Sequence, residues 1–102
     1  MALEAAGARI LDIEAHNGNR LPLSSILQTL RLNEVKSLMV EGGAQVIESF
    51  LSEPSFIDRV IITIAPVLMG TGVGYRSAMS GERFQHVHTE LFGKDVVVAY
   101  TA

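Results

Sequence analysis

The feature that most constrains this chain is an apolar run that ends on a carboxylate and two glycines. The run occupies residues 38–43 and passes directly into an amphipathic pattern at residues 44–47, so that the stretch reads LMVEGGAQVI. A second apolar run, residues 60–65, is followed by a glycine-rich loop at residues 68–75. Two strands joined by a helix, each followed by glycines, predict an α/β fold in which a phosphate group can bind at the strand ends.

The remaining elements follow from periodicity and from turn residues. Helices are predicted at residues 2–6, from residue 23 onward and at 44–52, and strands at residues 9–14, 35–40, 57–65, 84–91 and 96–101. The strand at 35–40 lacks alternation, which favours burial on both faces. The alternation of helices and strands predicts parallel pairing, including a right-handed βαβ crossover between Val40 and Asp58. Residues 92–95 predict a hairpin turn, so we expect a mixed sheet with a C-terminal antiparallel hairpin.

Composition narrows the class of protein. A chain of 102 residues suits a single domain spanning 1–102, and 48% hydrophobic residues with 19% charged residues is a globular balance. The net charge of −3 and the lack of a Lys/Arg run make binding to nucleic acid or to an anionic membrane unexpected. The absence of cysteine excludes disulfides, thiolate metal sites and cysteine nucleophiles. No apolar run has the length of a membrane span, so we expect a cytoplasmic protein.

The Glu41-Gly42-Gly43 turn is the best candidate for a binding site. A helix that starts here leaves its first backbone N–H groups unpaired, and a glycine at the N-cap provides no side chain to satisfy them. Such a helix end binds phosphate well, although a tight turn hydrated by water is the alternative. Glu41 could hold a substrate hydroxyl or amine or help to move a proton, or it could simply cap nearby amides. The residues alone leave these two roles open.

Two further features of the sequence have more than one interpretation. Gly70, Gly72 and Gly74 allow close approach of the backbone to a ligand, and a plain flexible connection is the alternative. His86 and His88 alternate on a predicted strand and so are expected to share one face. Two imidazoles can bind a metal, but no third ligand is evident nearby, so a solvated strand face is the favoured interpretation and no metal site is predicted.

Three segments together resemble a known family. LMVEGGAQVIESFL, DRVIITIAPVLMGTGVGY and FGKDVVVAYT are similar to the C-terminal half of the riboflavin-biosynthesis reductases. These include the fungal and archaeal 2,5-diamino-6-ribosylamino-4(3H)-pyrimidinone 5′-phosphate reductases and the reductase half of the bacterial deaminase-reductase. The resemblance extends from about Leu3 to Tyr100. It implies a dihydrofolate-reductase-like fold and an enzyme that uses NADPH to reduce a ribosylamino sugar to a ribitylamino chain.

The resemblance also assigns residues. It implies that Glu41 faces the ribose of a phosphorylated pyrimidine substrate and assists hydride transfer. It places one group of residues at the cofactor pyrophosphate or in the same helix start, namely Gly42, Gly43, Ala44, Gln45, Val46 and Ile47. It places Gly70, Gly72 and Gly74 at the mouth shared by cofactor and substrate.

The chain is short for this family, whose members are expected to be about twice its length on ordinary domain sizes. The missing half would supply the first strands of the sheet and part of the substrate pocket. A strand without its neighbour exposes apolar surface and unpaired backbone groups. We therefore expect a truncated form of the fold that associates as a homo-oligomer, with a homodimer as the simplest case. The alternative is a non-catalytic remnant that acts through protein association.

Overall fold

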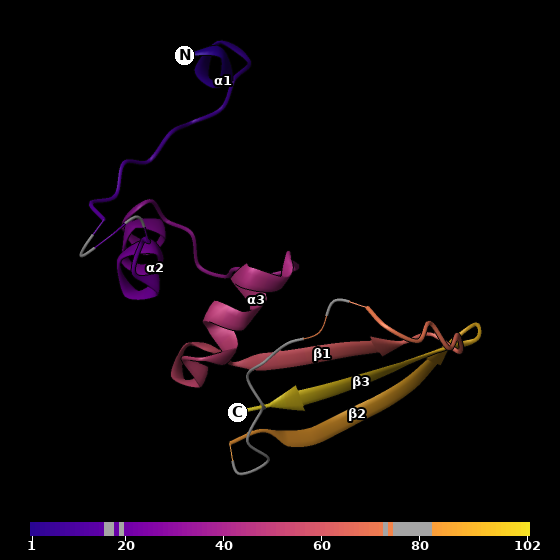
Figure 1. Cartoon of the computed structure of the whole chain (residues 1–102). Coiled ribbons are helices and arrows are strands. Elements are labelled where there is room, and N and C mark those ends of the chain that lie inside the picture. Colours follow the sequence, from indigo (N-terminus) through magenta and orange to yellow (C-terminus); the bar gives the residue numbers. More distant parts are fainter. Residues whose placement is uncertain (16–17, 19, 73, 75–82) are drawn as a thin grey trace. The chain divides into compact units, whose positions relative to one another are not determined.

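The computed structural model describes residues 1–15, 18, 20–72, 74 and 83–102, and the chain divides into two compact units. The first unit, Met1–Met39, contains α1 (Ala2–Ala5) and α2 (Leu23–Leu32) (Figure 1). The second unit, Val40–Ala102, contains α3 (Ala44–Leu51), the 3₁₀ turn η1 (Pro54–Phe56) and three strands. The strands are β1 (Arg59–Ile64), β2 (Gln85–Phe92) and β3 (Asp95–Thr101).

In the first unit, α2 is an amphipathic helix that starts after Pro22, whose backbone is extended. The N-cap is Pro22, and the helix predicted from residue 23 onward is confirmed. At the other end, the side-chain amide of Asn33 donates to the Thr29 carbonyl oxygen at 2.8 Å. The Arg9 guanidinium donates to the side-chain oxygen of Asn33, which ties residue 9 to the end of α2. The strand predicted at residues 9–14 does not form, because no described strand in this unit pairs with it.

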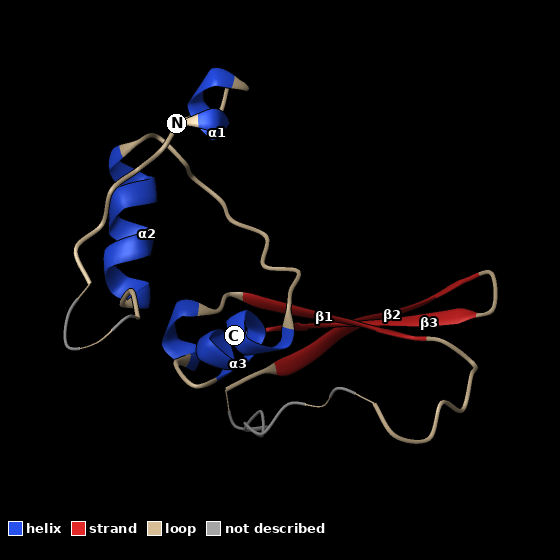
Figure 2. Cartoon of the chain, turned by 45° about the horizontal axis from the view of Figure 1, so that its top comes forward, coloured by secondary structure: helices blue, strands red, loops and turns tan. Residues whose placement is uncertain are grey.

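The second unit is built on a three-stranded antiparallel sheet of order β1-β3-β2. The register pairs Arg59 with Thr101 at one end of β1 and Ile64 with Val96 at the other. The predicted hairpin is confirmed: Phe92 pairs with Asp95, and the short loop between them joins β2 to β3 (Figure 2). Because β3 pairs with β1 as well as with β2, it is the central strand, and β1 and β2 are edge strands among the described residues.

The predicted parallel pairing is wrong for this chain. Residues 35–40 are coil, and every strand pair among the described residues is antiparallel. The sequence favoured a strand here because the run is short and apolar, but a strand forms only where a neighbour accepts its hydrogen bonds. None of the described strands pairs with this run, so the βαβ crossover is not completed. The α/β content and the terminal hairpin are confirmed, whereas the mixed strand direction is not.

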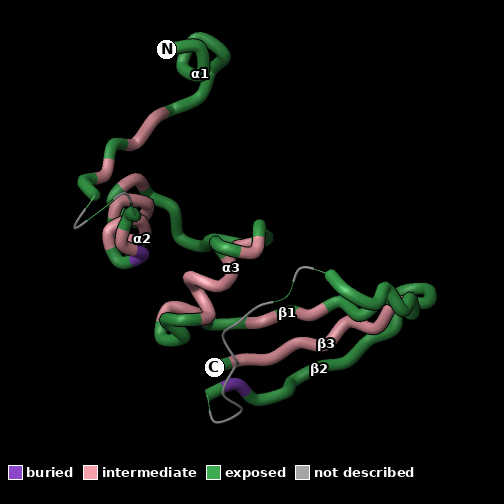
Figure 3. Tube along the Cα trace, in the orientation of Figure 1, coloured by how far each residue is buried: buried purple, intermediate pink, exposed green. Residues whose placement is uncertain are grey.

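Burial in the described residues is low and follows the strand order (Figure 3). Among the described residues, the buried apolar side chains are Leu23 in the first unit and Phe84 in the second. The central strand β3 is half-buried along its whole length, whereas the edge strand β2 is exposed throughout. The sheet therefore offers apolar surface that the described part of this chain does not cover.

Candidate functional site

The predicted site begins where α3 begins. Gly43 is the N-cap, with an extended backbone (φ −72°, ψ −168°), and no side chain caps the helix. The first hydrogen bond of the helix runs from the Ile47 N–H to the Gly43 carbonyl oxygen at 3.1 Å. The N–H groups of Ala44, Gln45 and Val46 therefore precede the first N–H that donates within the helix, and they carry the partial positive charge of the helix end. The sequence predicted this helix start to the residue.

The space around the two glycines differs. The peptide bond between Gly42 and Gly43 is cis, and Gly42 has a φ of 156°. A Cβ built on Gly42 would meet Cδ1 of Ile47 at 3.9 Å, whereas one built on Gly43 would meet none of the described residues beyond its chain neighbours within 4 Å. The N-cap thus has open space in front of it, which a phosphate could enter without displacing a side chain. The residues of this turn fit the diphosphate of a dinucleotide in two ways. Their free backbone N–H groups can donate hydrogen bonds to phosphate oxygens, and the open space at Gly43 lets a phosphate reach them.

Glu41 precedes the turn and is exposed. Its carboxylate makes no hydrogen bond or ion pair with another described residue, and it does not cap α3. The capping alternative is therefore not realised in the structure. The carboxylate is available to accept hydrogen bonds from a ligand that lies against the turn.

The glycine-rich loop follows β1. Gly70 has a φ of 72°, in the region that favours glycine, and Gly72 and Gly74 follow it in the exposed part of the loop. A Cβ built on any of the three would meet no described residue beyond the chain neighbours within 4 Å, so none of them is held against another described element. Tyr75, at the end of the predicted loop, lies outside the described residues. No hydrogen bond or ion pair among the described residues joins this loop to the turn at Gly43.

The structure corrects the placement of the two strand histidines. A β-bulge lies between His86, which pairs with Tyr100, and His88, which pairs with Ala99. Because adjacent residues of β3 point to opposite faces, the two histidines lie on opposite faces of the sheet rather than on the same one. Nothing in the alternating sequence signals this bulge.

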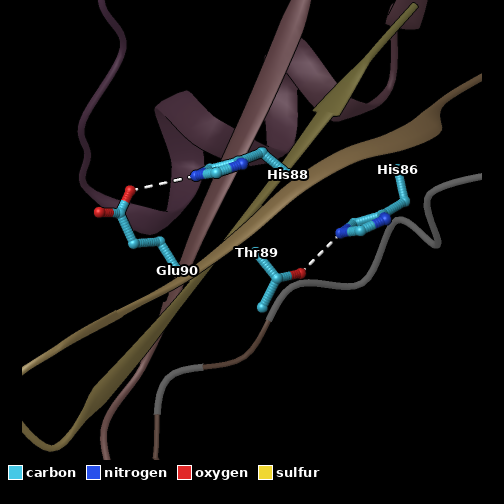
Figure 4. A network of polar contacts seen from close by, with 4 residues as sticks. All are labelled: His86, His88, Thr89 and Glu90. Carbon is cyan, nitrogen blue, oxygen red and sulfur yellow. Dashed lines mark hydrogen bonds and ion pairs between the residues drawn. The ribbon is translucent and has the colours of Figure 1, made fainter.

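Each histidine has its own partner (Figure 4). His86 Nε2 lies 2.6 Å from Oγ1 of Thr89, and His88 Nε2 lies 3.1 Å from Oε2 of Glu90. The His86 ring also meets the Tyr100 ring edge-on, at a centroid distance of 5.9 Å. The described residues contain no group of three or more potential ligands that could hold a metal ion.

The sequence analysis did not anticipate a shallow hollow on the sheet. It is lined by residues of all three strands, namely Arg59, Ile61, Val87, His88, Ala99, Tyr100 and Thr101. No local signal could have found it, because it depends on strand order and on the bulge. In the described part of the chain, no helix is long and apolar enough to cross a membrane.

Comparison with known proteins identifies the family. Residues 3–98 match the family described as the RibD C-terminal domain. This chain belongs to that family. The chain is 34% identical to the riboflavin biosynthesis protein RibD of Aquifex aeolicus, over 96% of this chain and 27% of that protein. It is 36% identical to the 2,5-diamino-6-ribosylamino-4(3H)-pyrimidinone 5′-phosphate reductase of Candida glabrata, over 68% of this chain and 29% of that protein.

A solved structure supports the same assignment at the level of fold. RibD of Acinetobacter baumannii superposes with a TM-score of 0.76 at 24% identity, covering 98% of this chain and 28% of that one. The resemblance to riboflavin-biosynthesis reductases and the truncated, dihydrofolate-reductase-like fold are thereby confirmed. The chain spans somewhat more than a quarter of the length of these RibD C-terminal domain relatives.

Proposed function

We propose that this chain is the cofactor-binding part of an NADPH-dependent reductase of riboflavin biosynthesis. The reaction would reduce the ribosylamino side chain of a pyrimidine 5′-phosphate to a ribitylamino chain. Support comes from the relatives, one of which is named as a reductase of such a pyrimidine phosphate. It comes also from a helix start whose donors are suited to a diphosphate.

The observation that carries the proposal is the uncapped start of α3. The N–H groups of Ala44, Gln45 and Val46 have no helical acceptor, and no described residue other than the chain neighbours of Gly43 lies within 4 Å of a Cβ built on Gly43. These donors would hold the pyrophosphate of NADPH, with the helix dipole adding a favourable charge interaction of up to about 2 kcal/mol. Ile47, whose side chain lies beside Gly42, would keep the turn in position.

The other predicted residues have supporting roles in this proposal. The Glu41 carboxylate would accept a hydrogen bond from a ribose hydroxyl and so orient the sugar, because it has no partner among the described residues. Gly70, Gly72 and Gly74 would allow the loop backbone to approach cofactor and substrate closely. Bound NADPH would supply the hydride, and these residues would bind and orient the reactants.

A second candidate function is association without catalysis. It is favoured by apolar side chains that the sheet leaves exposed, among them Ile61, Leu91 and Phe92. A homodimer would cover part of this surface and would be compatible with either function. The cytoplasmic location and the lack of nucleic-acid partners stay predictions.

A fluorescence titration of the folded chain with NADPH tests the proposal. We expect a dissociation constant in the micromolar range, and we expect inorganic pyrophosphate to displace the cofactor because both occupy the same N–H groups. Raising the salt concentration should weaken binding, since the contact is between charges. A folded, associated sample that binds no NADPH at concentrations up to about 1 mM would overturn the proposal in favour of the second function. A dissociation constant of about 1 mM corresponds to a binding free energy of about −4 kcal/mol.

A further inference from the structure

The outer edge of β2 is free in the described part of the chain. Because β3 lies between β1 and β2, β2 has a neighbouring strand on one side only. All 8 residues of the strand are exposed, as its green tube in Figure 3 shows. On an edge strand, every second residue directs its N–H and C=O groups away from the sheet, where a further strand can pair with them.

The side chains near the middle of this edge are a hydrogen-bond donor and an acceptor on one face. His88 pairs with Ala99 and Glu90 pairs with Val97, so the two side chains lie on the same face of the sheet. His88 Nε2 lies 3.1 Å from Oε2 of Glu90 (Figure 4). The two side chains are 65% and 53% exposed. The imidazole and the carboxylate can therefore make further contacts with a strand that lies alongside β2.

The order of residues in β2 is self-complementary about Thr89. If β2 of a second copy lies antiparallel to it with the two Thr89 residues opposite each other, His88 of each copy faces Glu90 of the other. The twofold axis then keeps both donor–acceptor pairs on the same face of the sheet. Moving the axis by one residue destroys this match, because it places either two Glu90 carboxylates or two His88 rings opposite each other.

Exposed apolar residues lie at both ends of this short ladder. The β-bulge leaves Val87 without a partner residue in β3, and it interrupts regular pairing beyond His88. In the antiparallel arrangement, Leu91 of each copy reaches the bulge at Val87 of the other. Val87 is 56% exposed and Leu91 is 70% exposed, so this contact removes apolar surface from water.

We propose that the outer edge of β2 is the surface through which two copies of this chain associate, by an antiparallel β2–β2 ladder centred on Thr89. The two sheets become one sheet of order β1-β3-β2-β2-β3-β1. The occupant is a second copy because one short segment supplies both the donor and the acceptor of each pair, as an isologous contact requires. The proposal goes beyond the proposed function, and it does not require NADPH to bind.

Disulfide trapping tests the register. The chain contains no cysteine, so Thr89→Cys introduces a single thiol on the proposed twofold axis. Directly opposed residues of antiparallel strands have Cβ atoms about 4.5–5.5 Å apart, and a disulfide needs about 3.5–4.5 Å, so a small adjustment joins the two thiols. Under mild oxidation without cofactor, we expect a covalent dimer that reductant dissolves.

Thr63→Cys is the matched control for trapping. It makes the same substitution at an exposed threonine of β1, the edge strand on the other side of the sheet. Its thiols are not held together by the proposed contact, so they should cross-link at least about tenfold more slowly than those of Thr89→Cys.

Charge exchange tests the pairs on either side of the axis. His88→Glu places carboxylates opposite each other in both pairs and should weaken association at least about tenfold, measured by analytical ultracentrifugation. The double variant His88→Glu with Glu90→Lys again places a donor opposite an acceptor, and its dissociation constant should return to within about threefold of the original. Gln85→Glu is the control, because it adds a carboxylate to the same exposed strand outside these pairs and should change association by less than about threefold.

Three results would overturn the proposal. The first is a chain that stays monomeric in light scattering at concentrations up to about 1 mM. The second is trapping at position 89 that is no faster than at position 63. The third is a double variant that associates as weakly as His88→Glu while circular dichroism shows an intact sheet. Since NADPH is left out of every measurement, none of these outcomes depends on whether the chain binds the cofactor.

Discussion

The Ile47 N–H and the Gly43 carbonyl oxygen, 3.1 Å apart, form the first hydrogen bond of α3. The N–H groups of Ala44, Gln45 and Val46, which lie between these two residues, have no acceptor within the helix, and Gly43 contributes no side chain to cap them. The N-cap is therefore the position at which a single substitution changes the charge and the access of the proposed cofactor site while leaving the helix in place.

Gly43→Asp should weaken NADPH binding at least about tenfold, or about 1.4 kcal/mol. The new carboxylate would cap the free N–H groups and repel the cofactor phosphates. Fluorescence titration measures the loss, and circular dichroism checks that the helix remains.

Gly43→Asn is the matched control for charge. Asparagine caps a helix about as well as aspartate and has nearly the same shape, but it is neutral. It should weaken binding less than aspartate does, and the difference between the two variants should shrink as salt is added. Equal effects of the two variants at every salt concentration would show that the site does not sense phosphate charge.

Glu41→Gln tests the role of the carboxylate. Since Glu41 is exposed and has no partner among the described residues, the free energy of unfolding should change by less than about 0.5 kcal/mol. NADPH oxidation by an active preparation of this chain should nevertheless fall at least about tenfold, because the glutamine amide cannot act as a carboxylate acceptor or base. Glu53→Gln, at another exposed glutamate, is the control and should leave the rate unchanged. A loss of stability in Glu41→Gln would instead indicate a structural role.

The helix at Gly43 shows which features the sequence predicts well. An apolar stripe of helical period, a glycine turn before it and Pro54 after it are local signals, and α3 (Ala44–Leu51) forms where they indicate. The hairpin is equally local, since Gly93 occupies the turn between two strands that are adjacent in sequence. Such elements are specified by neighbours a few residues away.

The predictions that were wrong concern features that depend on residues far away in the sequence. Residues 35–40 have the composition of a buried strand, but pairing depends on a neighbour that the described chain does not supply. The bulge that separates His86 from His88 likewise depends on how β2 is held against β3. For the candidate site, the sequence predicts the helix start, whereas the relation between Gly43 and the loop at Gly70 depends on tertiary contacts that no local pattern encodes.

The hairpin turn provides a prediction about stability. Gly93 has a φ of 62° and is the first of two loop residues between the paired Phe92 and Asp95, the pattern of a type II′ turn. Gly93→Ala should lower the free energy of unfolding by about 1 to 2 kcal/mol, because a side chain disfavours this backbone conformation. Lys94→Ala, at the other loop position, should change it by less than about 0.5 kcal/mol. Urea denaturation followed by circular dichroism measures both, and equal effects would rule out the turn assignment.

The two phenylalanines at the ends of β2 provide the last prediction. Phe84, just before the strand, is 8% exposed, while Phe92, at its end, is 57% exposed. Next to Phe84, Arg83 donates to the Ser55 carbonyl oxygen at 3.4 Å and lies over the Phe84 ring, so this end of β2 is held beside η1.

Phe84→Ala should therefore destabilise the second unit by about 3 kcal/mol, through lost burial and an unfilled space. Phe92→Ala removes the same atoms from a mostly solvated site and should cost less than about 1 kcal/mol. Urea denaturation of both variants, with the strand signal of circular dichroism as the readout, gives the comparison. If Phe92→Ala proves as costly as Phe84→Ala, then Phe92 is covered in solution, and association through the exposed strand would be the first explanation to examine by light scattering.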